Sequence, residues 1–135
     1  MKATAFYLRY GVVALLVFTG LLLGVAPHAA YGGGELDGKA FVMPEEGKKD
    51  VLTFDNGKFH SALCDKYGFG KGDYTTARTT DGTSFKAETA SAREGNMVWS
   101  GVVKGDSLEG SYTWTKKGWF RTKTRTKNFT AVLKQ

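Results

Sequence analysis

Few residues of the kinds that carry catalysis or hold metal ions occur in this chain of 135 residues. It has one cysteine, Cys64, and two histidines, His28 and His60. A single thiol cannot form an internal disulfide bond, so the fold must depend on its own packing. A transition-metal site would need help from carboxylates, and the acidic residues are mostly scattered singly. We therefore expect no metal site, no cofactor and no enzymatic activity.

His60 and Cys64 are the one pair that invites a nucleophile–base interpretation. They lie four residues apart in a segment that alternates like a strand. Their side chains would share a face but stand about 13 Å apart, at roughly 3.3 Å per residue. That separation is too long for a hydrogen bond, which argues against a catalytic pair. With Phe59 and Ser61 facing inward, we expect both side chains on the outer face and Cys64 to be a weakly exposed thiol.

The glycine-rich segment 67–72, Tyr-Gly-Phe-Gly-Lys-Gly, lacks the Gly-Lys-Ser/Thr ending of a phosphate-binding loop. No helical pattern follows it to supply a helix N-terminus. A flexible hairpin loop is the simpler interpretation. A further hypothesis is that the alternating Tyr67, Phe69 and Lys71 fold over one mouth of the domain as a lid.

A long apolar run is confined to residues 11–26, and Lys2 and Arg9 stand ahead of it. The run is shorter than the roughly 20 residues that a membrane-spanning helix needs. A basic start, a short apolar middle and small residues at the end are typical of a secretory signal. We therefore predict a signal segment at residues 1–30 and one domain at residues 31–135, exported to the periplasm or secreted. Cleavage at that point places a histidine where a small residue is preferred, so a retained N-terminal membrane anchor is the alternative.

Positive charge is concentrated near the C-terminus. The chain carries a net charge of +6, yet the segment 116–127 alone holds six basic residues and no acidic one. These are Lys116, Lys117, Arg121, Lys123, Arg125 and Lys127. In an extended segment the last four share one face with Trp119, and we expect that face to be exposed to solvent.

This basic segment has two interpretations. In one, it is a solvated hairpin whose charges keep a strand edge from aggregating. In the other, it is a patch with aromatic tips that contacts an anionic envelope component, such as lipid head groups or an acidic polymer. Export argues against nucleic acid as a partner.

Strict alternation of apolar and polar residues, the pattern of a half-buried strand, is clearest at 108–115. The two-residue turn Gly105–Asp106 fixes its pairing with 97–104, because such turns leave little freedom of register. The predicted pairs join apolar, aromatic or glycine residues: Val103 with Leu108, Gly101 with Gly110, Trp99 with Tyr112, and Met97 with Trp114. The opposed glycines predict a sharp bend of the sheet, and the alternative is that they leave room for a ligand.

Two further turns predict hairpins. Asn56–Gly57 pairs Phe54 with Phe59, which brings two aromatic side chains together. The Asp81–Gly82 turn predicts three pairs: Arg78 with Phe85, Thr76 with Ala87, and Tyr74 with Thr89. In the last strand, the alternation places Phe129, Ala131 and Leu133 inward.

About eight strands follow from these signals, near 38–43, 50–55, 58–64, 73–79, 84–91, 97–104, 107–115 and 126–134. Sequential hairpins at regular spacing favour an all-β fold, a small antiparallel up-and-down barrel. An open sandwich is the alternative, although it usually needs long crossover connections that this chain lacks.

Several stretches resemble the small calycin-type barrels, which include lipocalin-like and avidin-like proteins. They are Trp99-Ser-Gly101, Lys104-Gly-Asp106, Leu108-Glu-Gly110, Tyr112-Thr-Trp114 and Phe129-Thr-Ala-Val-Leu133. The resemblance is one of spacing and covers most of the predicted domain. It implies a barrel that holds a small apolar ligand, and it assigns no ligand residues.

The predicted register gives the barrel an aromatic interior, and we expect a non-enzymatic protein that binds a small apolar ligand there. The expected ligand-binding residues are Trp99, Tyr112, Trp114 and Tyr74, with Arg78 at the rim. Arg78 shares the inward face, so its guanidinium must either reach solvent or meet an anion. The alternative is a solid barrel, an interaction module that contacts anionic surfaces or polymers through the segment 116–127.

Overall fold

The computed structural model describes residues 31–32 and 34–135, and the predicted signal segment at 1–30 lies outside them. The described residues form nine strands and one short 3-10 helix. They are β1 (Tyr31–Gly32), β2 (Ala40–Glu45), β3 (Lys48–Asp55), β4 (Lys58–Ser61), η1 (Ala62–Tyr67), β5 (Gly72–Thr79), β6 (Gly82–Ser91), β7 (Gly95–Lys104), β8 (Ser107–Lys117) and β9 (Thr122–Leu133). In this part of the chain, no helix has the length and apolar character needed to span a membrane.

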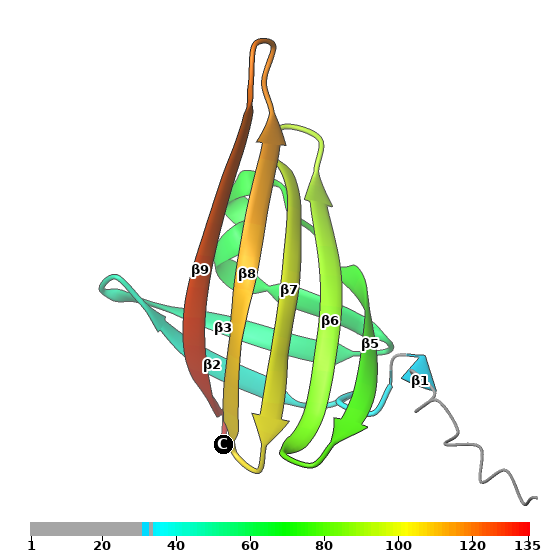
Figure 1. Cartoon of the computed structure of the whole chain (residues 1–135). Helices are drawn as coiled ribbons and strands as arrows, with labels where there is room; N and C mark the ends of the chain where they lie inside the picture. The colour runs from blue at the N-terminus through cyan, green and yellow to red at the C-terminus, as the bar shows by residue number, and fades with distance from the viewer. Residues whose placement is uncertain (1–30, 33) are drawn as a thin grey trace, which may run out of the picture.

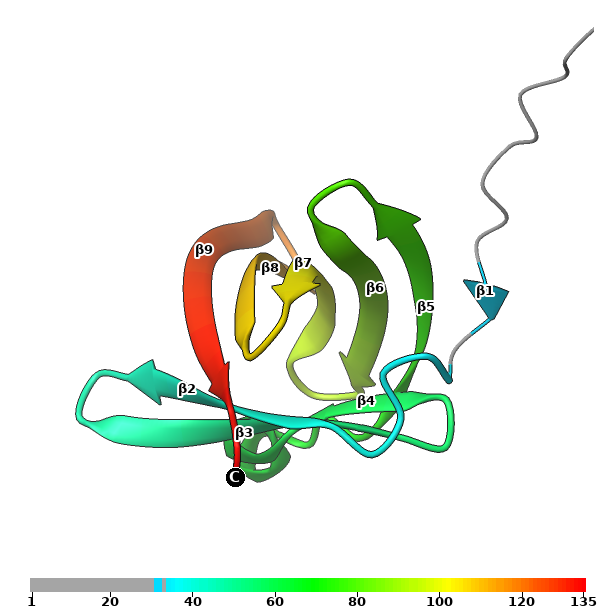
Figure 2. The same ribbon diagram turned by 90° about the horizontal axis from the view of Figure 1, so that it is seen from below.

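The strands β2 to β9 close into an antiparallel up-and-down barrel. Each strand pairs with its neighbours along the chain, and β9 returns to pair with β2 through Val42 and Val132. Figure 1 shows β5 to β9 side by side, and Figure 2 shows the ring with β2, β3 and β4 along one side. β1 lies outside the ring, against β5. The predicted all-β barrel is confirmed.

Two of the three predicted hairpins, β7–β8 and β3–β4, have the predicted register. In β7 and β8, Trp99 lies opposite Tyr112 and Met97 lies opposite Trp114. In β3 and β4, Phe54 lies opposite Phe59. Because the period of a strand is two residues, these pairs fix which side chains enter the barrel.

The predicted register of the third hairpin is wrong by two residues. Tyr74 lies opposite Ala87, not Thr89, and Thr76 lies opposite Phe85. The pair that closes the turn is Thr79 with Gly82, so the two loop residues are 80 and 81. The Thr79 hydroxyl accepts a hydrogen bond from the Gly82 N–H at 3.1 Å and donates one to the Gly82 carbonyl at 3.0 Å. A slip of two residues leaves the inward face unchanged.

The strand predicted at 58–64 ends early. β4 stops at Ser61, and η1 follows it. The buried carboxylate of Asp50 causes this departure, because it accepts hydrogen bonds from the Ser61 hydroxyl at 2.5 Å and from the Leu63 N–H at 2.9 Å. Cys64 therefore lies on η1, packed against the barrel core, and not on the outer face of a strand.

Aromatic side chains fill one end of the barrel, which we call the closed end. The ring of Phe54 lies 5.3 Å from Phe59, 5.0 Å from Tyr74 and 5.0 Å from Phe85, measured between ring centroids. The chain around Leu36 covers this end, since the Tyr74 hydroxyl accepts the Leu36 N–H at 3.2 Å. All these side chains are almost fully buried, so this end holds no room for a ligand.

The barrel contains its own core. Its buried hydrophobic residues fall between Leu36 and Ala131, and the ring of paired strands falls between Ala40 and Leu133. A closed sheet around a complete core is an independent folding unit. Residues 31–135 are therefore expected to fold by themselves.

Candidate ligand-binding cleft

The end of the barrel opposite the closed end is hollowed by two adjoining clefts. The upper cleft has a volume of about 530 Å³ and the inner cleft about 350 Å³. They share Glu46, Tyr67, Met97 and Tyr112 as lining residues, so we treat them as one site, the mouth cleft. Its walls come from the β2–β3 turn, η1, the β6–β7 turn and the upper halves of β7, β8 and β9. Sites for small organic ligands have volumes of about 300–1,000 Å³.

The floor of the mouth cleft is apolar. Phe69, Met97 and Trp99 are buried there, with Trp99 only 1% exposed. The Trp99 indole N–H donates to the Thr89 hydroxyl at 3.3 Å, so its one polar atom already has a partner. The Trp99 and Tyr112 rings lie 4.8 Å apart, which continues the core aromatic cluster up to the floor of the cleft.

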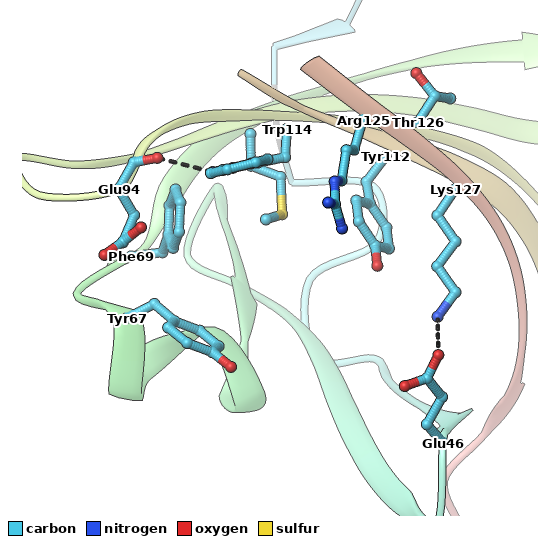
Figure 3. Close-up of a pocket in the computed structure, with 10 residues that line it drawn as sticks. Glu46, Tyr67, Phe69, Glu94, Tyr112, Trp114, Arg125, Thr126 and Lys127 are labelled. Carbon is cyan, nitrogen blue, oxygen red and sulfur yellow. Dashed lines mark hydrogen bonds and ion pairs between the residues drawn. The ribbon is translucent and has the colours of Figure 1, made fainter. Parts of the chain in front are cut away.

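The β8 wall presents two half-buried aromatic side chains, Tyr112 and Trp114 (Figure 3). The Trp114 indole N–H donates to the Glu94 carbonyl at 2.7 Å. Lys116 on the same strand binds the Glu94 carboxylate at 3.1 Å. These two contacts tie β8 to the β6–β7 turn and hold the Trp114 ring against the cleft. Burial raises the pKa of Tyr112 above its ordinary value.

The β9 wall brings two of the basic residues into the cleft. Lys127 and Arg125 precede the buried Phe129 by two and four residues, so they share its inward face. They lie opposite Tyr112 and Trp114 in the register, and both line the upper cleft. We expected them on a face exposed to solvent. Both are indeed solvent-exposed, but on the inner side of the sheet.

The two cations differ in their partners. Lys127 forms ion pairs with Glu45 and with Glu46, the latter at 3.8 Å. Its hydrogen bond to Glu45 raises the pKa of Lys127. The contact also joins β9 to the β2–β3 turn across the mouth. Among the ion pairs of residues 34–135, none includes Arg125, so its guanidinium is available to a ligand.

The inner cleft reaches the only thiol of the chain. Cys64 lines it, and burial raises the pKa of this thiol, which keeps it protonated. His60 is engaged elsewhere, with its Nε2 at 2.6 Å from the Asp65 carboxylate. In the part of the chain that the structure describes, no three His, Cys, Asp or Glu side chains gather where they could hold a metal ion.

Two expected ligand-binding residues lie away from the cleft. Tyr74 is 1% exposed and packs in the closed end, where its hydroxyl donates to Asp37 at 2.7 Å. Arg78 lies at the rim of that same end, where its side chain is 80% exposed and pairs with Glu35 at 3.2 Å. Of the expected set, the structure brings Trp99, Tyr112 and Trp114 together at the mouth.

Phe69 and Glu94 were not among the expected ligand-binding residues. The lid hypothesis for 67–72 did point to Tyr67 and Phe69, and both line the upper cleft. Nothing in the sequence pattern indicated Glu94, because its contacts with Trp114 and Lys116 depend on where the β6–β7 turn meets β8.

Comparisons of the chain with protein-family models, with curated protein sequences and with solved structures found no match. The closed ring of eight antiparallel strands, β2 to β9, is consistent with a calycin-like architecture. A barrel with a buried aromatic cluster is compatible with ligand binding. The geometry of the mouth cleft is therefore the basis for inferring a function.

Proposed function

We propose that the protein is an exported, non-enzymatic barrel that binds a small, largely apolar molecule carrying one anionic group, and that it does so in the mouth cleft. The observation that carries the proposal is the cleft itself. An apolar, aromatic floor lies beside Arg125, a cation with no ion-pair partner among the described residues.

The apolar part of the ligand is supported by the lining of the upper cleft. Phe69 and Met97 form its base, and the Trp114 ring stands as a wall fixed by its hydrogen bond to Glu94. Rigid aromatic surfaces gain binding energy from apolar contact without losing much conformational freedom. The filled core at the closed end limits the ligand to the mouth, so it must be small.

The anionic group is supported by the difference between Arg125 and its neighbours. Lys116 and Lys127 are neutralised by glutamates, whereas Arg125 faces the cleft without one. A guanidinium presents a fixed fork of N–H donors that matches a carboxylate, sulfonate or phosphate. We propose binding without catalysis, since burial raises the pKa of the Cys64 thiol in the inner cleft and so disfavours its nucleophilic thiolate form.

Two related fluorescent probes test this function. 1-Anilinonaphthalene-8-sulfonate combines an aromatic body with an anionic group, and N-phenyl-1-naphthylamine has a similar body without charge. Titration of residues 31–135 with each probe is expected to show saturable binding. Arg125→Gln should weaken binding of the anionic probe by about tenfold, the loss of one charge-assisted hydrogen bond, and leave the neutral probe unchanged.

Two variants make the test specific. Arg121→Gln removes a cation from the same hairpin outside the cleft and should leave both titrations unchanged. Trp114→Ala removes the β8 wall and should weaken both probes. If Arg125→Gln and Arg121→Gln have the same effect, or if Trp114→Ala binds both probes as tightly as the unmodified barrel, the cleft is not the binding site.

A further inference from the structure

The tip of the β8–β9 hairpin exposes two adjacent aromatic side chains. Trp119 is 94% exposed and Phe120 is 92% exposed, more than any other large hydrophobic residue in the described chain. Their rings stack on each other, with centroids 5.5 Å apart and planes 12° apart. Two large aromatic rings held together in solvent mark an interaction site, because a soluble protein gains nothing from their exposure.

The tip projects from the barrel. Figure 1 shows the β8–β9 hairpin extending beyond the other strands, at the same end as the mouth cleft. The Gly118 N–H donates to the Arg121 carbonyl at 2.9 Å, which closes the turn that carries the two rings. A flat surface that approaches this end of the molecule therefore meets Trp119 and Phe120 first.

Exposed cations surround the two rings. Lys117, Arg121 and Lys123 are all exposed, and none takes part in an ion pair of the described residues. We call residues 117–123 the hairpin tip. It differs from Lys116 and Lys127 of the basic segment, which pair with glutamates, and from Arg125, which lines the mouth cleft. The sequence after Glu109 contains no acidic residue, so residues 117–123 themselves carry no negative charge.

We propose that the hairpin tip docks on a bilayer that contains anionic lipids. Trp119 and Phe120 insert at the level of the head groups, and the three cations contact the anionic head groups around them. Tryptophan favours this interface because its ring is apolar and its N–H stays hydrated. Cations near an anionic membrane surface add to binding one by one.

The aromatic pair favours a bilayer over a soluble acidic polymer. A polymer would neutralise Lys117, Arg121 and Lys123 but would leave the two rings in water. A bilayer satisfies both features of the tip together. Docking in this way also brings the entrance of the mouth cleft toward the membrane surface, because Arg125 lies two residues beyond Lys123 on the same strand.

Vesicle binding by residues 31–135 tests the proposal. Sedimentation with vesicles of phosphatidylcholine alone is compared with vesicles that also contain phosphatidylglycerol, and only the mixed vesicles are expected to bind. The triple variant Lys117→Gln, Arg121→Gln, Lys123→Gln should lose about a hundredfold in affinity, at about fivefold for each charge. The double variant Trp119→Ser, Phe120→Ser should lose at least about tenfold through the lost apolar insertion.

Matched controls come from elsewhere on the same barrel. Lys39→Gln, Lys86→Gln, Lys104→Gln removes three exposed cations away from the tip, and Val132→Ser removes an apolar side chain that is 61% exposed on β9. Both controls should bind mixed vesicles nearly as the unmodified barrel does. The emission of Trp119 should shift to shorter wavelength on binding, a shift that Trp119→Phe abolishes.

The rings distinguish the possible partners. If the double aromatic variant binds mixed vesicles as tightly as the unmodified barrel, the membrane proposal is overturned. The proposal is also overturned if dextran sulfate in solution binds as tightly as the vesicles and neither kind of binding depends on the two rings. That result would identify an acidic polymer as the partner. Circular dichroism melts of the tip variants should be unchanged, since these side chains pack against no core residue. The tip variants should still bind the anionic probe, which shows that their mouth cleft is intact. A loss of vesicle binding in these variants is then a property of the tip alone.

Discussion

Gly101 on β7 and Gly110 on β8 lie directly opposite each other, and neither position has room for a side chain. A Cβ atom on Gly110 would lie 2.3 Å from the Ser100 carbonyl oxygen, and one on Gly101 would lie 2.9 Å from the Phe85 ring. The missing side chains let the sheet bend sharply over the aromatic core. On the inner face of the sheet this space is occupied by Phe85, Leu108 and Phe129, so the pair does not make room for a ligand inside the barrel.

The first prediction concerns this glycine pair. Gly110→Ala should destabilise the barrel by about 1–3 kcal/mol, because the new methyl group forces the backbones of β7 and β8 apart. Urea denaturation of residues 31–135 measures the change. Gly70→Ala is the matched control, since a Cβ atom there meets nothing within 4 Å and should change the free energy of unfolding by less than about 0.5 kcal/mol. Equal stabilities of the two variants would contradict the bend.

A second prediction concerns the buried carboxylate that ends β4. Asp50→Ala should cost about 1–3 kcal/mol of unfolding free energy, because the Ser61 hydroxyl and the Leu63 N–H lose their acceptor. The exposed Asp55 on the same strand provides the control, and Asp55→Ala should be nearly neutral. Hydrogen exchange adds a local readout, since the Leu63 amide should lose protection in Asp50→Ala. Retained protection of that amide would show that the carboxylate does not hold η1 in place.

The third prediction is a pH dependence. Burial, and then the hydrogen bond to Asp37, raise the pKa of Tyr74 to about 12. A tyrosine in the unfolded chain ionises near pH 10. The folded pKa is the higher one, so the stabilisation is complete below about pH 10 and is lost as the pH rises toward 12. Melting temperatures across this interval should fall for the unmodified barrel.

Tyr74→Phe isolates this effect. It should melt lower than the unmodified barrel at pH 9, because the Gly34 and Leu36 amides lose their acceptor. Between pH 10 and 12 its melting temperature should fall less steeply, since the ionisable group is gone. Tyr67→Phe, at an exposed tyrosine, should keep the original dependence. Parallel curves for Tyr74→Phe and the unmodified barrel would show that Tyr74 does not titrate with folding.

Local patterns in the sequence predict most of the barrel. The Gly105–Asp106 turn and the alternation on both sides of it are sufficient for the β7–β8 register, because a two-residue turn leaves one compatible pairing. The Asp81–Gly82 signal failed for a local reason. Glycine is also favoured at the last position of a turn, and Gly82 occupies that position with a φ of +148°.

Features that depend on contacts distant in the sequence were not predictable in this way. η1 forms where the carboxylate of Asp50 draws Leu63 away from the β4 line, and no pattern within 58–64 indicates this. The inward direction of Arg125 and Lys127 was implied by the parity of Phe129. A charged residue on an inward face must lie near an open end of the barrel, however, where it reaches solvent. The sequence does not show which end is open.

The filled closed end and the hollow mouth separate the residues that stabilise this barrel from those that line the proposed ligand site. Phe54 and Phe85 stabilise one end, while Phe69, Trp114 and Arg125 line the other. Side chains at the mouth can therefore be randomised in a library while the aromatic packing is left as it is. This division makes residues 31–135 a scaffold for selecting new binding specificities without a single disulfide bond.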